Sequence, residues 1–165
     1  MFLKIINKID NNLFVSFLEK YVNILKYFSF TPKVFYLLFI FIIILENRVQ
    51  NLPLIGVYLI VEILVYVLKR VIKRKRPVEI KSSLFQKLSG YYPDKYSFPS
   101  AHSFTVFLLL PFVYSSWGIY LGTVWMVYSI IVVCSRVALK HHFLSDVIAS
   151  IFVSSVLGLI IIKII

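Results

Sequence analysis

The chain has 165 residues, of which 60% are hydrophobic and only 15% are charged, so it is too apolar for an ordinary soluble domain. Eighteen Lys and Arg residues against seven Asp and Glu residues give a formal net charge of +11, which favours an anionic partner such as a phosphorylated lipid. The apolar composition favours lipid over nucleic acid. The single cysteine, Cys134, excludes a disulfide framework or a cysteine zinc site within one chain.

The N-terminal part of the chain is expected to lie in the membrane interface. Residues 2–28 mix apolar and charged side chains at roughly helical spacing, which predicts an amphipathic interfacial helix. Charges interrupt every candidate signal-peptide core there, so we expect the segment to stay on the mature protein. Residues 34–45 are uninterruptedly apolar and form a short first membrane span. Residues 52–68, with Glu62 as their only charge, form a second.

A long apolar stretch follows the polar middle of the chain. Residues 96–135 carry no formal charge apart from a proton on His102, and as one helix they would be about 60 Å long. No bilayer needs that length, so we expect two spans joined by a tight turn at residues 115–118. Residues 147–162 form the last span.

The predicted fold is all-α, a polytopic membrane helix bundle. It consists of an N-terminal amphipathic interfacial helix in residues 1–30 and five transmembrane helices in residues 31–165, all in one domain covering residues 1–165. The only long polar loop, residues 69–98, holds nine of the eighteen basic residues. Loops of that length in compact proteins usually carry function.

Three short clusters contain the polar residues that a phosphate site needs. They are Lys69 with Arg76-Pro77, then Phe98-Pro99-Ser100-Ala101-His102, and then Ser135-Arg136 with His142 and Asp146. Because successive spans alternate in direction, all three clusters fall at span ends on one face of the membrane. We therefore expect them to form a single site.

Four of these residues suit the binding of phosphate oxygens. Ser100 precedes an apolar helix and is the expected N-cap, which leaves backbone N–H groups of the first turn for an anion. Lys69, Arg76 and Arg136 add cationic donors that stabilise phosphoryl transfer without a metal.

The titratable residues suit covalent chemistry. His142 and Asp146 are four residues apart and share one helix face, so the carboxylate can orient the imidazole as a nucleophile. His102 is the expected acid that protonates the leaving oxygen. His141 is an alternative nucleophile that the spacing disfavours. Zinc ligation by His102, His142 and Asp146 is a further alternative, but the surrounding cations would repel the ion.

The three clusters, in this order, resemble the type 2 phosphatidic acid phosphatase superfamily. Its pattern is Lys, six residues, Arg-Pro; then Pro-Ser-Gly-His; then Ser-Arg, five residues, His, three residues, Asp. The chain departs from it only at Ala101, where the pattern has Gly; alanine keeps the N–H donor and adds a methyl group. A joint match of this kind is far more specific than any one cluster.

The resemblance implies a membrane-embedded phosphatase that needs no metal or other cofactor. It implies a phosphohistidine intermediate on His142, protonation of the leaving group by His102, and Asp146 as orienter. The residues implied to bind the phosphate are Lys69, Arg76, Ser100, Ala101 and Arg136.

The expected partners are a phosphorylated membrane lipid and the bilayer, without nucleic acid. Bacterial members of the resembling family act on undecaprenyl diphosphate, phosphatidylglycerol phosphate, phosphatidic acid or lipid A 1-phosphate, and the compact basic chain favours the last. A different class of function is a phosphate-binding transporter or a cationic membrane scaffold, in which the same basic residues bind anions. Release of phosphate from a lipid distinguishes the two classes.

Two groups of charged residues stand outside the motifs. Arg70, Lys73, Arg74 and Lys75 are expected to form a solvated basic rim that contacts lipid head groups. Glu62 lies inside a span, seven residues before Lys69 and on the same helical face, so it either orients Lys69 or pairs with another base.

The two arguments about membrane orientation conflict. If the interfacial helix lies on the site face, Arg48 and Lys163 are the only two of eighteen basic residues on the other face, and the positive-inside rule puts the site in the cytoplasm. The family resemblance implies the periplasmic or outer face of a bacterial inner membrane. We expect the outer face, with the basic residues serving to capture anionic lipid.

Overall fold

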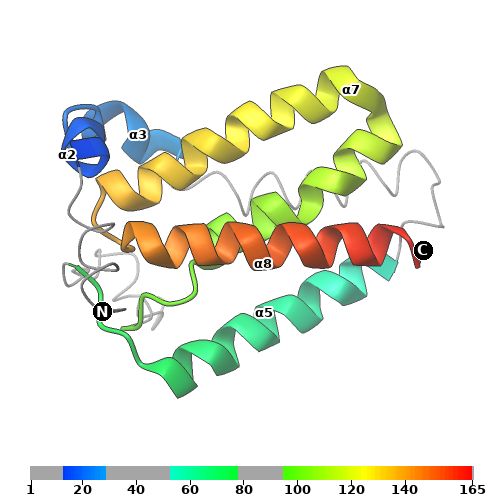
Figure 1. Cartoon of the computed structure of the whole chain (residues 1–165), viewed down its shortest axis with the longest axis horizontal. Coiled ribbons are helices and arrows are strands. Elements are labelled where there is room, and N and C mark those ends of the chain that lie inside the picture. Colours follow the sequence, from blue (N-terminus) through cyan, green and yellow to red (C-terminus); the bar gives the residue numbers. More distant parts are fainter. Residues whose placement is uncertain (1–12, 29–52, 78–94, 165) are drawn as a thin grey trace, which may run out of the picture.

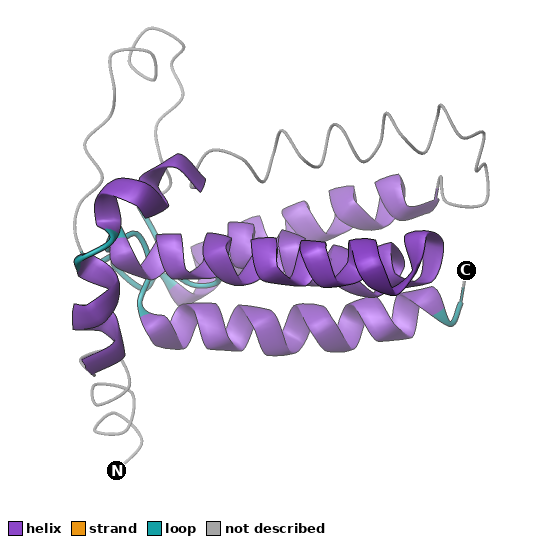
Figure 2. Cartoon of the chain, turned by 90° about the horizontal axis from the view of Figure 1, so that it is seen from above, coloured by secondary structure: helices purple, strands orange, loops and turns teal. Residues whose placement is uncertain are grey.

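In the computed structural model, residues 13–28, 53–77 and 95–164 are described, and this part of the chain is all-helical, as predicted. Its helices are α2 (Leu13–Glu19), α3 (Val22–Phe28), α5 (Pro53–Ile72), α7 (Ala101–Ala138) and α8 (Leu144–Ile162). The long helices α5, α7 and α8 run alongside one another, and the short helices α2 and α3 lie beside the end at which α8 begins (Figures 1 and 2).

The helix α7 is a hairpin with two arms. Gly118 interrupts it with φ 78° and ψ −176°, a conformation that side chains with a Cβ atom rarely adopt. Figure 1 shows α7 running along the bundle and then returning. The indole N–H of Trp125 on the second arm donates to the carbonyl of Val106 on the first (2.9 Å), which ties the arms together. The turn predicted at residues 115–118 is therefore confirmed.

Two helices of the described chain, α7 and α8, are long and apolar enough to cross a membrane. The helix α5 has 20 residues but carries Glu62, Lys69 and Arg70. The span predicted at residues 34–45 lies outside the described residues. The number of five transmembrane helices therefore stays a prediction.

The N-terminal segment packs against the end of the bundle. Leu18 of α2 is buried in one apolar cluster with Val137, Ala138, Leu144 and Val147 of α7 and α8. The segment also exposes large apolar and aromatic side chains: Phe14, Phe17, Tyr21, Ile24 and Tyr27. Instead of one continuous helix, the described part of this segment forms α2 and α3 with a turn between them. Its placement in a membrane interface stays a prediction.

The helix ends that carry the three clusters converge. The C-terminus of α5, the N-terminus of the first α7 arm, the C-terminus of the second arm and the N-terminus of α8 all lie at the same end of the bundle (Figure 1). Just inside this end, Val61 and Val65 of α5 pack against Phe104 and Leu108 of α7. The convergence predicted from the alternating direction of the spans is confirmed.

Candidate functional site

The connection between α7 and α8 holds a buried imidazole, that of His142. Its Nδ1 lies 2.5 Å from the backbone oxygen of Ser97, and its Nε2 lies 3.3 Å from Nη1 of Arg76. A carbonyl oxygen only accepts and a guanidinium only donates, so Nδ1 carries the proton and Nε2 carries the lone pair. The ring is therefore held in the tautomer in which Nε2 is nucleophilic.

The protonation of the two neighbouring histidines follows from their surroundings. Burial, and then the charges of Arg76, Lys69 and Arg136, lower the pKa of His142 well below its ordinary value of 6.5. Burial and the charges of Arg136 and Arg76 lower the pKa of His141 to about 4. Both rings are neutral at pH 7, so Nε2 of His142 keeps a lone pair, which accepts from Arg76 in this structure.

The cationic residues predicted to bind phosphate gather around this ring. Arg76 also donates from Nη1 to the carbonyl of His141 (2.7 Å), which holds its guanidinium beside the histidine pair. The ammonium of Lys69 is buried and donates to the carbonyl of Tyr96 (3.1 Å). The backbone oxygen of Arg136 accepts from the N–H groups of both histidines (3.1 and 3.3 Å), and its side chain is buried. The structure thus brings three of the predicted binders to His142.

The second cluster lies at the start of α7. Ser100 is the N-cap residue, as predicted, but its hydroxyl pairs with that of Ser103 (3.0 Å) instead of capping the helix. The N–H group of Ser100 donates to Oγ of Ser150 on α8 (2.8 Å). Ser100 is fully buried. Its predicted binding of phosphate therefore stays a prediction.

Ala101 and His102 occupy the first turn of α7. The methyl group of Ala101, which replaces the glycine of the family pattern, packs against the apolar cluster that joins α5 and α7. The side chain of alanine therefore has apolar neighbours at this position. His102 is half-buried at the same end of the bundle, and its predicted role as the acid stays a prediction.

Asp146 takes different partners from those that its spacing suggested. Its Oδ1 accepts from Nη1 of Arg74 (2.5 Å), and its Oδ2 accepts from the N–H of Phe143 (3.1 Å), which caps α8. The ring nitrogens of His142 face Ser97 and Arg76. These contacts do not include one between the carboxylate of Asp146 and the ring of His142. Direct orientation of the imidazole by Asp146 therefore stays a prediction.

Arg74 corrects one expectation from the sequence, because it does not belong to the solvated rim. Its guanidinium pairs with Asp146, donates to Oγ of Ser145 (2.7 Å) and lies 4.2 Å from the centre of the Phe143 ring. Sequence reasoning missed it because four consecutive basic residues look alike in a single sequence.

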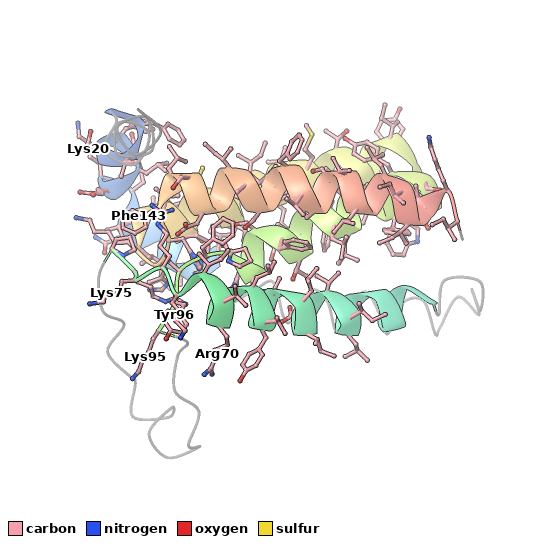
Figure 3. All side chains as sticks on the ribbon, turned by 60° about the horizontal axis from the view of Figure 1, so that its bottom comes forward. Lys20, Arg70, Lys75, Lys95, Tyr96 and Phe143 are labelled. Atoms are coloured by element: carbon pink, nitrogen blue, oxygen red, sulfur yellow. The ribbon has the colours of Figure 1, made fainter. Side chains whose placement is uncertain are left out.

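The other members of the expected rim, Arg70, Lys73 and Lys75, are exposed. Figure 3 shows the side chains of Arg70, Lys75 and Lys95 pointing away from the bundle at this end.

Ser97 is a second site residue that the motifs left out. It is fully buried between the Arg74 segment and His142. In the sequence, its only signal is its place just before the Phe98-Pro99-Ser100 cluster. Glu62 is half-buried and accepts from the hydroxyl of Thr105 on α7 (3.4 Å), a partner that neither sequence interpretation anticipated. No group of three His, Cys, Asp or Glu side chains in the described ranges is arranged to hold a metal ion.

The fold and the site together define a membrane-associated helical protein whose neutral imidazole is surrounded by cations, a combination suited to phosphoryl transfer. Residues 50–165, more than two thirds of the chain, match the family model of the PAP2 superfamily. The chain therefore belongs to the PAP2 superfamily, and it is an enzyme, a phosphatase acting on phosphate esters, consistent with a lipid phosphatase. Comparisons with curated proteins and with solved structures returned no match.

Proposed function

We propose that the protein removes a phosphate group from a phosphorylated membrane lipid through a phosphohistidine on His142, without a metal. The observation that carries the proposal is the pair of contacts on this ring. Nδ1 is tied to the Ser97 carbonyl, and the lone pair of Nε2 faces Arg76. Lys69 and Arg136 lie close enough for their charges to lower the pKa of the same ring. An anionic phosphate drawn to these cations would meet the lone pair.

The proposed reaction has two steps. The lone pair of Nε2 attacks phosphorus, an N–P bond forms, the P–O bond to the lipid breaks, and His102 gives its proton to the leaving oxygen. Water then attacks the phosphohistidine, passes a proton to His102 and releases inorganic phosphate. The charge on the phosphate oxygens is stabilised by Lys69, Arg76, Arg136 and the backbone N–H groups that follow Ser100 at the start of α7, beginning with that of Ala101.

The surroundings of the site support a lipid substrate. The helices α7 and α8, which end at the site, have the apolar surface of membrane spans. The segment α2–α3 exposes Phe17 and Tyr21 at the same end, where aromatic residues suit a membrane interface. A lipid could therefore present its head group to the site while its tails stay in the bilayer.

Lipid A 1-phosphate is the first substrate that we propose. Exposed Arg70, Lys73 and Lys75 at the site end suit a head group with more than one negative charge. Undecaprenyl diphosphate and phosphatidylglycerol phosphate are the alternatives in the same reaction class. We propose a bacterial inner membrane, with the site on the periplasmic or outer face. A reporter fused after Ile165 tests this, because α8 leads from the site to the opposite face; reporter activity outside the cytoplasm would contradict an outward site.

The decisive experiment is phosphate release by the purified chain in lipid nanodiscs, with EDTA present, from a panel of these lipids. We expect release from at least one lipid and an acid-labile phosphoenzyme when the reaction is quenched early. A metal enzyme would lose its activity in EDTA. A transporter or scaffold would release no phosphate from any lipid, and that result would contradict the proposal.

A further inference from the structure

A continuous series of contacts leads from Asp146 to His142 through two residues outside the family pattern. It begins at the guanidinium of Arg74, which donates to the carboxylate of Asp146 (2.5 Å) and to Oγ of Ser145 (2.7 Å). The guanidinium also lies over the ring of Phe143. These partners all belong to the beginning of α8, so they fix the segment around Arg74 onto that helix.

The second part of the series is Ser97. Its N–H group donates to the backbone oxygen of Arg74 (2.8 Å), and its hydroxyl lies within reach of the oxygens of Arg74 (3.3 Å) and Lys75 (3.1 Å). The carbonyl of the same residue accepts from Nδ1 of His142. Ser97 therefore binds the anchored segment through its N–H and hydroxyl groups, and it binds the imidazole through its carbonyl oxygen.

We propose that Arg74 and Ser97 are positioning residues for the nucleophile, and that the carboxylate of Asp146 acts on His142 through them. This inference rests on the proposed function of His142. It adds two residues to the machinery and replaces a direct carboxylate–imidazole contact by a relay through an arginine and a backbone carbonyl.

The physical reason is the requirement for one tautomer. A neutral imidazole attacks from Nε2 only when the proton is on Nδ1, and a buried N–H is stable only when it has an acceptor. Here that acceptor is a carbonyl in an irregular segment, whose direction depends on what holds the segment. Two residues beyond Arg74, Arg76 faces Nε2 of the same ring. Anchoring Arg74 therefore fixes both partners of the ring, the Ser97 carbonyl at Nδ1 and the Arg76 guanidinium at Nε2.

The proposal is tested on the full chain in nanodiscs with Arg74→Gln, which keeps hydrogen-bonding groups but removes the charge. We expect kcat for lipid phosphate release to fall about 100-fold, because small misplacements of a reacting group cost that much. We expect KM to change little, because the phosphate binders remain. Arg74→Lys restores part of kcat. In an Asp146→Asn background, Arg74→Gln adds little further loss, because both substitutions break the same contact.

The matched control is Lys140→Gln. Lys140 is a basic residue at the same end of the molecule, but its ammonium pairs with exposed Glu19 (3.1 Å). Its loss removes one charge and leaves the relay intact, so kcat should stay near that of the unsubstituted chain. Ser97→Ala removes only the hydroxyl contacts and should lower kcat about tenfold, the effect of one lost hydrogen bond. It serves as the second test where Arg74→Gln folds poorly.

A purely structural ion pair would give different results. It would lower the amount of folded protein and leave kcat per phosphorylatable site unchanged. The chain has only three histidines, so ¹⁵N-histidine spectra contain few ring signals, and those lost in His142→Ala identify the ring of His142. We expect the Nδ1–H tautomer in the unsubstituted chain and a mixture in Arg74→Gln.

Two failures remain distinguishable. Full activity of His142→Ala would overturn the proposed function itself. An inactive His142→Ala, together with an Arg74→Gln variant whose kcat and tautomer match those of Lys140→Gln, would overturn the relay alone.

Discussion

The two ends of the α7–α8 pair are built on different principles. At the end where α8 begins, the buried side chains include polar and charged ones: Lys69, Ser97, Ser100, Arg136, His142 and Asp146. Near the α7 turn and the end of α8, the buried cluster is Leu109, Phe112 and Val113, with Trp117, Trp125, Ile161 and Ile162 packed against it. The same helices thus carry a polar site at one end and an apolar core at the other.

The difference shows what each end requires. Every buried polar group at the site end needs a partner in one geometry, and several partners come from distant segments, as Arg74 and Asp146 do. At the far end, the apolar side chains need only to fill the space between the helices. A Cβ atom on Gly158 would lie 2.6 Å from the Leu108 carbonyl oxygen, which shows how closely α8 approaches the first arm of α7. Substitutions should therefore impair chemistry at one end and stability at the other.

The largest effect is expected at His142. His142→Ala removes the proposed nucleophile and should lower kcat by about 10⁴-fold or more, as loss of a nucleophile does in other enzymes. His141→Ala should keep most of the activity, because the proposed reaction gives the ring of His141 no role. Both are measured by phosphate release per folded molecule. An active His142→Ala together with an inactive His141→Ala would assign the attack to His141 and contradict the proposed mechanism.

His102→Gln should have the next largest effect. It removes the proposed acid and should lower kcat about 10²- to 10³-fold on a lipid phosphate. With an aryl phosphate, whose leaving group needs no proton, the loss should be much smaller. Equal losses on both substrates would contradict the assignment of His102 as the acid, while leaving the role of His142 intact.

The features that sequence could predict are those set by periodicity and direction. The apolar stretch of residues 96–135 was too long for one span, so a tight turn at residues 115–118 was required, and the structure turns at Gly118. Alternating direction then placed Lys69, Arg76 and His142 at one end, where the contacts and charges around the ring bring them together. These deductions needed no knowledge of side-chain contacts.

The contacts within the site could not be predicted in the same way. A spacing of four residues put His142 and Asp146 on one helix face, but α8 begins at Leu144, so His142 lies outside the helix. Its ring turns to Ser97, and the carboxylate takes Arg74 instead. Which basic residue besides Arg76 turns inward depends on the path of the backbone after α5. A single sequence does not encode that path in any visible pattern.

The far end gives a smaller effect with no chemical consequence. Gly158→Ala forces a methyl group against backbone, so we expect a loss of about 1–3 kcal/mol in unfolding free energy. The kcat per folded molecule should not change. Gly56→Ala is the matched control, because a Cβ atom there meets nothing within 4 Å and alanine favours the helix. A fall in kcat of Gly158→Ala without loss of stability would break the division between the two ends.

Acidification should lower the stability of the folded chain through the buried histidine at the site end. In the folded chain the pKa of His142 lies well below 6.5, whereas in the unfolded chain it is close to 6.5. Below pH 6.5, the ring of His142 therefore binds a proton in the unfolded chain but stays neutral in the folded chain. Stability is complete above pH 6.5 and is lost as pH falls toward the folded pKa, by at most about 1.4 kcal/mol per pH unit for this one ring.

His141, with a pKa of about 4, adds to this loss in the same direction. Thermal unfolding of the chain between pH 7.5 and pH 5 measures the slope, with buffers matched in ionic strength. We expect His142→Gln to flatten it, because glutamine binds no proton in either state. Gly158→Ala should lower the whole curve without changing its slope, since the side chains of the described apolar cluster at that end bind no proton in this pH range. An unchanged slope in His142→Gln would mean that this ring is not held neutral, and the nucleophile would then need a different source of its lone pair.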